Sequence, residues 1–158
     1  MGWRFGQKLR YLRTRSQLTQ VELAQRLHLA SHAHISNLET SRFAPSLDVI
    51  IATAIHFSVR VEYLLREELP LQAAEVQGYQ RGLGAALGVS FFGLNLAQLR
   101  VQAGLTQVQL AEQLGLSAHA HVSSMESGRK QPSIELLLRA AARFGVTADQ
   151  MLSPPTQE

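Results

Sequence analysis

Cysteine is absent from the 158 residues, so neither a disulfide nor a thiolate metal site can form. No apolar run approaches the ~20 residues that a membrane-spanning helix needs. Nor does a charged leader followed by an apolar segment open the chain. Charged residues are scarce at 17%, whereas hydrophobic residues make up 46%, which favours a folded core over disorder. These absences predict a soluble, cytoplasmic protein with no membrane partner.

The net charge of +3 is unevenly distributed along the chain. Residues 1–66 hold nine Lys and Arg against four Asp and Glu, residues 67–88 hold one against three, and residues 89–158 hold five against five. The three segments therefore carry +5, −2 and 0. Because basic segments attract polyanions such as DNA, the first segment is the one in which charge favours nucleic-acid binding.

The sequence contains an internal repeat. Shifted by 87 positions, residues 5–65 align without a gap with residues 92–152, and 25 of the 61 pairs are identical. A match of this length indicates that the chain carries two copies of one structural unit. We expect the units at 1–66 and 89–152, a linker at 67–88 that is helical in part, and a flexible tail at 153–158.

Each copy has the pattern of several short helices, because apolar residues recur at intervals of three and four and no alternating stretch is long enough for a strand. The apolar stripes of the first copy are Phe5, Leu9 and Leu12; Val21, Leu23, Ala24 and Leu27; Ile35 and Leu38; Leu47, Ile50, Ile51, Ala54 and Phe57; and Val61, Leu64 and Leu65. In the second copy the expected core includes Leu110, Leu114, Leu136, Leu137 and Phe144. The pattern predicts an all-α fold.

Helix starts are marked at equivalent positions in both copies. Thr19 stands three residues before Glu22, and Thr106 three before Gln109, so each pair can form a reciprocal capping box at the start of the second helix. A Pro-Ser pair precedes the fourth helix of each copy, where the serine can accept free main-chain amides.

One stretch of the second copy has a recognisable pattern: LTQVQLAEQLGLS at 105–117, VSSMESGR at 122–129, and Pro-Ser at 132–133. It resembles the Cro/Xre, lambda-repressor-like helix-turn-helix family, and the likeness extends over about 61 residues in each half. The resemblance implies two tandem five-helix DNA-binding domains joined by a linker. In such a domain the second and third helices form the motif, and the third enters the major groove.

The resemblance also assigns site residues by their place in the motif. Base-reading positions fall on His32, Ala33, Asn37, His119, Ala120 and Ser124. Backbone-contacting positions fall on Gln20, Ser31, Arg42, Gln107, Ala118, Arg129 and Lys130. Ion pairs between the first and third helices are implied for Arg13 with Glu39 and for Arg100 with Glu126. Asparagine can bond adenine bidentately and serine several bases, so the two units are expected to read similar but unequal half-sites.

Two departures from the family pattern concern the third helix. The turn before it is one residue longer than the usual family turn. After it, Ser41 stands where the second copy has Gly128, and Phe43 stands where it has Lys130. Because glycine adopts positive φ most easily, Ser41 predicts a different loop path in the first copy.

The function implied is a sequence-specific regulator of transcription that binds a double-stranded operator, acts as a repressor by default, and is not an enzyme. No cofactor, metal ion or small-molecule ligand is expected: paired histidines two residues apart point in different directions, and neither a phosphate-loop nor a nucleophile-elbow pattern occurs. The alternative is that one unit binds DNA while the other is a dimerisation or protein-interaction module, as in an antitoxin. A homodimer fits either interpretation.

Overall fold

The chain forms two compact units, Met1–Ala85 and Ala86–Glu158, here called unit 1 and unit 2. The computed structural model describes residues 4–73 and 87–155. The helix expected within the linker at 67–88 and the end of the tail expected at 153–158 therefore fall mostly outside the described residues. Each unit is considered by itself below.

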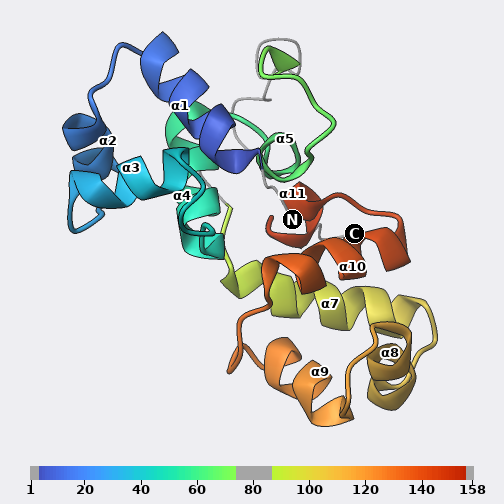
Figure 1. The fold of residues 1–158 in the computed structure, drawn as a ribbon. Helices are drawn as coiled ribbons and strands as arrows, with labels where there is room; N and C mark the ends of the chain where they lie inside the picture. The colour runs from blue at the N-terminus through green and yellow to red at the C-terminus, as the bar shows by residue number, and fades with distance from the viewer. Residues whose placement is uncertain (1–3, 74–86, 156–158) are drawn as a thin grey trace. The chain divides into compact units, whose positions relative to one another are not determined.

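Both units are built from short helices in the same order (Figure 1). The described part of unit 1 contains α1 (Phe5–Arg15), α2 (Gln20–Arg26), α3 (His32–Glu39), α4 (Leu47–Phe57) and α5 (Val61–Leu65). That of unit 2 contains α7 (Ser90–Gln102), α8 (Gln107–Gln113), α9 (His119–Glu126), α10 (Ile134–Phe144) and α11 (Ala148–Met151). Every regular element in these ranges is a helix, which confirms the predicted all-α fold with two tandem units. No helix among them is both long enough and apolar enough to cross a bilayer.

The expected helix starts are confirmed. Thr19 accepts the main-chain N–H of Glu22 at 3.1 Å, and the Glu22 carboxylate accepts the main-chain N–H of Thr19 at 2.7 Å. Thr106 and Gln109 form the same reciprocal box at the start of α8. Such a cap satisfies amides that the first helical turn leaves without partners, which fixes where α2 and α8 begin.

A continuous apolar core fills each unit, and most of the expected core positions are confirmed. Its largest fully buried apolar side chains are Tyr63, Phe5, Leu9, Leu23, Ile35, Leu38, Ile50 and Leu64 in unit 1, and Phe92, Leu96 and Leu110 in unit 2. Three expectations need correction. Val21 is 50% exposed, because it lies on the outer side of α2, and Leu136 and Phe144 are only half-buried at the edge of α10.

α1 approaches the end of α3 so closely that only glycine fits at the contact. A Cβ built on Gly6 would lie 2.2 Å from the main-chain oxygen of Leu38, and one built on Gly93 would lie 2.1 Å from that of Met125. Both distances are far below van der Waals contact, and both neighbours are backbone atoms that cannot turn aside. This approach sets the distance at which the third helix sits on the first in each unit.

A buried polar side chain ties the first helix of each unit to the end of the fifth. The Lys8 ammonium, fully buried, donates to the main-chain oxygens of Tyr63, at 2.5 Å, and Arg66, and lies 4.8 Å from the centroid of the Tyr63 ring. Burial lowers the pKa of Lys8 to about 8. In unit 2 the equivalent Asn95 donates its side-chain amide to the main-chain oxygen of Ser153 at 2.7 Å. An ammonium in unit 1 and an amide in unit 2 thus fill the same structural role.

Candidate nucleic-acid interface

The third helix of unit 1, α3, buries one side and exposes the other. Ile35 and Leu38 are buried in the core. His32 and Ala33 are exposed and Asn37 is half-buried. Because residues four apart are neighbours on a helix surface, Ala33 and Asn37 lie on the same face, and His32 stands beside them at the helix start. The three side chains that the family resemblance assigns to base reading are therefore accessible together.

The equivalent helix of unit 2, α9, has the same division. Val122 and Met125 are buried, whereas His119 and Ala120 are exposed and Ser124 is half-buried. The side chains on the accessible face are short and uncharged or titratable near neutrality. Such side chains are suited to the edges of base pairs in a major groove, where hydrogen bonds and methyl contacts distinguish the pairs.

The turn before the third helix is alike in both units. Five residues separate α2 from α3 and α8 from α9. The N–H of Leu29 donates to the main-chain oxygen of Ala24 at 2.8 Å, and the equivalent bond in unit 2 has the same length. Ser31 and Ala118 end the two turns as exposed N-cap residues, and neither side chain caps its own helix. Both residues stand beside the accessible faces of α3 and α9.

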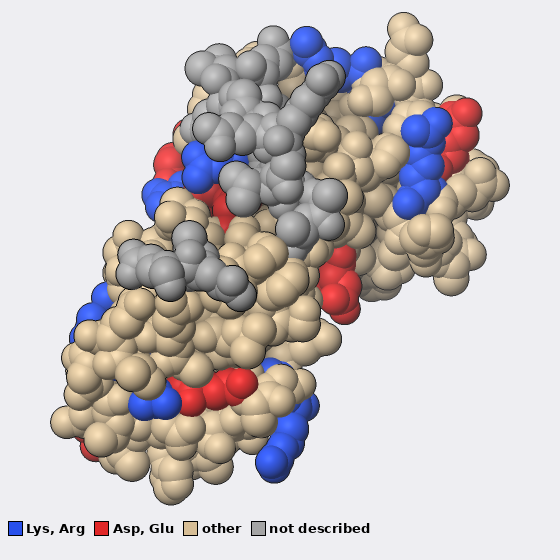
Figure 2. All heavy atoms as spheres, turned by 180° about the vertical axis from the view of Figure 1, so that it is seen from behind, with Lys and Arg blue, Asp and Glu red and all other residues tan. Residues whose placement is uncertain are grey.

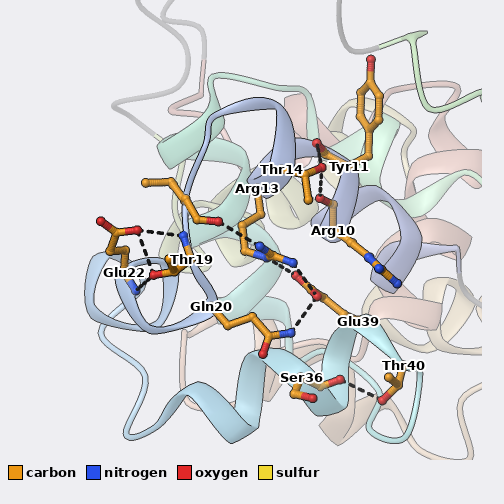
Figure 3. A network of polar contacts seen from close by, with 11 residues as sticks. Arg10, Tyr11, Arg13, Thr14, Thr19, Gln20, Glu22, Ser36, Glu39 and Thr40 are labelled. Carbon is orange, nitrogen blue, oxygen red and sulfur yellow. Dashed lines mark hydrogen bonds and ion pairs between the residues drawn. The ribbon is translucent and has the colours of Figure 1, made fainter.

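An ion pair joins the first and third helices of unit 1 (Figure 3). The Arg13 guanidinium donates to both carboxylate oxygens of Glu39, at 2.5 and 3.1 Å, and to the main-chain oxygen of Leu18 at 2.8 Å. The side chain of Glu39 is 4% exposed, and its hydrogen bond with Arg13 raises the pKa of Arg13 above its ordinary value. The Gln20 side chain donates to the same carboxylate at 2.9 Å. Helices α1, α2 and α3 therefore meet at one carboxylate.

Unit 2 repeats this network residue for residue. Arg100 donates to Glu126 at 2.6 and 3.1 Å and to the main-chain oxygen of Leu105 at 2.9 Å, and Gln107 donates to Glu126 at 2.9 Å. In both units the glutamine at the start of the second helix is held next to the end of the third. This contact positions the glutamine that the family resemblance assigns to a DNA phosphate.

The expectation of a different loop path after α3 is wrong. Ser41 adopts φ of 56° and Gly128 adopts φ of 74°, so both are left-handed. The N–H of the following arginine donates to the main-chain oxygen of Asn37 in unit 1 and of Ser124 in unit 2, at 2.9 Å in each case. Because this bond closes the helix end in both units, the chain follows the same path although serine is less suited to it than glycine.

The two loops differ in the side chains they carry. Arg42, Arg129 and Lys130 are exposed, whereas unit 1 has an apolar residue, Phe43, 57% exposed, at the position of Lys130. On the side of the molecule seen in Figure 2, basic side chains form small separate groups, some beside acidic ones, on a mostly uncharged surface. The basic side chains that could contact a phosphate backbone are therefore few, and each carries weight.

The sequence identified Phe43 as a departure but gave no sign of its partner. The Phe43 ring packs edge-to-face against His34, with centroids 6.5 Å apart. This places His34, unlike His32, against an aromatic neighbour. Within residues 4–73 and 87–155 no three histidine, aspartate or glutamate side chains gather closely enough to hold a metal ion.

Comparison with known families matches both units. A family model described as "Helix-turn-helix" matches residues 96–151, and another described as "Helix-turn-helix domain" matches residues 4–58. No solved structure matches the chain.

Three known proteins are similar to parts of the chain. The uncharacterized HTH-type transcriptional regulator y4dJ of Sinorhizobium fredii is 36% identical over 62 residues, which is 39% of this chain and 79% of that protein. The HTH-type transcriptional activator BcrR of Enterococcus faecalis is 47% identical over 62 residues, 39% of this chain but only 30% of BcrR. The immunity repressor protein of Bacillus phage phi105 is 26% identical over 111 residues, 61% of this chain and 76% of that protein.

Proposed function

This chain belongs to the helix-turn-helix family of DNA-binding transcription regulators, and we propose that both of its units bind double-stranded DNA, with α3 and α9 each entering a major groove. The observation that carries the proposal is the pair of accessible helix faces. Each presents a histidine, an alanine and a half-buried asparagine or serine above buried core residues. A groove roughly 12 Å wide admits one helix, so one such face can read one half-site.

The neighbouring residues supply contacts to the sugar-phosphate backbone. Gln20 and Gln107 are held beside the third helix by a glutamate, and exposed arginines follow that helix in both units. Ser31 and Ala118 lie between these two groups, where a phosphate can approach main-chain amides. Contacts of this kind fix the position of the protein on the duplex and add affinity, while base contacts add specificity.

Two reading units in one chain act as a covalent pair. We propose units at 1–66 and 89–152 joined by the linker at 67–88. The described ends of this linker contact their own units: the Tyr63 hydroxyl donates to the main-chain oxygen of Leu71 at 2.8 Å, and Gly88 N–H donates to that of Leu152 at 2.9 Å. The chain between residues 73 and 87 can span at most ~50 Å, which suffices for half-sites one helical turn, ~34 Å, apart.

Binding to an operator that overlaps a promoter blocks the polymerase, and we propose repression as the outcome. Tethering raises the local concentration of the second unit once the first is bound, so that the pair binds more tightly than either unit. The alternative, in which unit 2 serves mainly as an interaction module, draws support from its net charge of zero against +5 for the first 66 residues.

The proposal is tested with paired substitutions in the full-length chain. His32→Ala with Asn37→Ala removes the polar side chains of one reading face, and His119→Ala with Ser124→Ala removes those of the other. Each pair is expected to weaken binding to an operator selected from random duplexes by about 10- to 100-fold, because a specific base contact contributes about 1–3 kcal/mol. Binding to random DNA should change little. Fluorescence anisotropy with labelled duplexes measures both affinities.

A matched control is Arg129→Ala, which is expected to weaken operator and random DNA alike and to reduce the salt dependence. Equal losses on the two DNAs for the histidine pairs would contradict base reading by these helices. An unchanged operator affinity for the unit 2 pair alone would favour the model with one reading unit.

A further inference from the structure

The outer face of α7 is apolar. Leu94 and Val101 are 53% and 64% exposed, and Ala97 between them is half-buried. Spacings of three and four residues place these side chains on one face of the helix, and the core residues Phe92 and Leu96 lie on the opposite side. We call Leu94, Ala97 and Val101 the α7 strip.

The equivalent face of α1 in unit 1 is polar. Gln7, Arg10 and Thr14 occupy the positions of the α7 strip, and all three are exposed. Because the two helices have the same place in the same fold, the fold itself does not require apolar residues there. Exposed apolar side chains that form one contiguous strip indicate a contact with another molecule.

The charge around the α7 strip restricts the kind of partner. Arg100 is the one charged residue of α7, and its guanidinium is bound to Glu126. The exposed residues beside the strip, Ser90, Gln98 and Gln102, are neutral. In a symmetric contact a surface meets its own copy, so an unpaired charge would face an identical charge. The α7 strip is free of this repulsion, whereas Arg10 would create it in unit 1.

We propose that the α7 strip joins two copies of this chain, with α7 of one copy packed antiparallel against α7 of the other. A two-fold axis at Ala97 brings Leu94 of each copy against Val101 of the other, and the small alanine lets the helices approach closely. A helix of 13 residues is ~20 Å long and covers less than the ~800 Å² per partner of a stable interface. The dimer is therefore weak, with a dissociation constant on the order of 100 µM.

Sedimentation equilibrium without DNA tests the association independently of the proposed function. The full-length chain is expected to show a mass that rises above 17.4 kDa with concentration up to ~500 µM. The double variant Leu94→Gln with Val101→Thr takes the residues that unit 1 carries at positions 7 and 14. It is expected to keep the wild-type circular dichroism spectrum and to dimerise at least ~10-fold more weakly.

A second test retains both large side chains. Since the chain has no cysteine, Ala97→Cys introduces a single thiol at the proposed axis, where mild oxidation should give a disulfide-linked dimer. Arg10→Cys, at the equivalent position of unit 1, is the matched control and should cross-link much more slowly. Equal cross-linking rates, a constant mass of 17.4 kDa for the wild type, or a double variant that dimerises like the wild type would each overturn the proposal.

Discussion

Unit 1 and unit 2 follow the same backbone path with different residues at its most demanding points. Four positions of unit 1 have positive φ without glycine, and the residue 87 places later is a glycine with positive φ each time. The pairs are Gln17 and Gly104, His28 and Gly115, Ser41 and Gly128, and Ser58 and Gly145. A residue with a Cβ pays about 1–2 kcal/mol for a left-handed backbone. Unit 1 therefore carries strain at four helix ends where unit 2 carries none.

This difference teaches that hydrogen bonds at the helix ends, and not glycine, determine the loop path. At Ser58 and Gly145 the chain leaves the fourth helix in the same way, with the next N–H bonded to Ala54 and Ala141 at 3.0 Å. The same closure was seen after the third helix. The path is enforced in unit 1 against residue preference, so the comparison can be broken or sharpened one position at a time.

The largest effect is expected at the glycines that the two units share. Gly6→Ala and Gly93→Ala should each destabilise their unit by about 3 kcal/mol or more, because the new methyl group meets a carbonyl oxygen at about 2 Å. Urea unfolding followed by circular dichroism gives the loss, and hydrogen exchange shows which unit opens. Gly88→Ala is the control, since its Cβ would make only ordinary contacts at 3.5 Å. A loss below about 1 kcal/mol at either glycine would contradict the close helix approach.

A pH effect confined to unit 1 is expected next. The pKa of Lys8 is lowered from 10.5 to about 8 by burial, so between these pH values the unfolded chain binds the proton that the folded chain has lost. The stability of unit 1 should therefore rise from pH 8 towards pH 10, by at most about 2–3 kcal/mol. Above pH 10 the trend reverses, because burial raises the pKa of Tyr63 to about 12 and the unfolded tyrosine ionises first.

Urea unfolding at several pH values checks this difference between the units. Asn95 replaces the lysine in unit 2, so its stability should lack the rise. Lys8→Asn should remove the rise from unit 1. Equal slopes in both units, or a fall in the stability of unit 1 between pH 8 and pH 10, would show that burial of the ammonium does not govern this response.

A smaller effect is expected from exchanging residues at a left-handed position. Ser41→Gly should stabilise unit 1 by about 0.5–1 kcal/mol, because relief of the backbone strain exceeds the entropy that glycine adds to the unfolded chain. Gly128→Ser should cost unit 2 a similar amount, since a Cβ there would meet nothing within 4 Å and only the backbone is strained. The two midpoints in urea report the shifts. Shifts of the same sign would refute the assignment of strain.

The smallest effect in free energy is expected for the exposed loop side chains. Lys130→Phe should lower the slope of the logarithm of DNA affinity against the logarithm of salt concentration by about 0.9, and Phe43→Lys should raise it by the same amount. Folding should be unaffected, because both positions are exposed. Titrations of the operator at several salt concentrations provide the slopes. A slope unchanged by Lys130→Phe would mean that this lysine contacts no phosphate.

The repeat, the helical class and the helix starts could be predicted from the sequence because they depend on local patterns. Apolar spacing and capping residues act within one or two turns, and both were confirmed. The expected path at Ser41 was wrong because residue preference was taken as decisive, while the closing hydrogen bond outweighs it. Val21 was misplaced because a short helix such as α2 turns a small part of its apolar stripe outward.

Other features depend on distances between helices that no local pattern encodes. The requirement for glycine at position 6 arises from the approach of α3, which is more than 30 residues away in sequence. The burial of Lys8 depends on the end of α5, and lysine is ordinarily exposed. The reading faces could be assigned by resemblance alone, since it is the accessibility of His32 and His119 in the fold that shows what they can reach.

The most direct test of two reading units is a hydroxyl-radical footprint of the full-length chain on an operator selected from random duplexes. The account predicts two protected patches on one side of the duplex, with centres about 10 base pairs apart. His32→Ala with Asn37→Ala should abolish one patch, and His119→Ala with Ser124→Ala the other. A single patch that is insensitive to one of these pairs would contradict it.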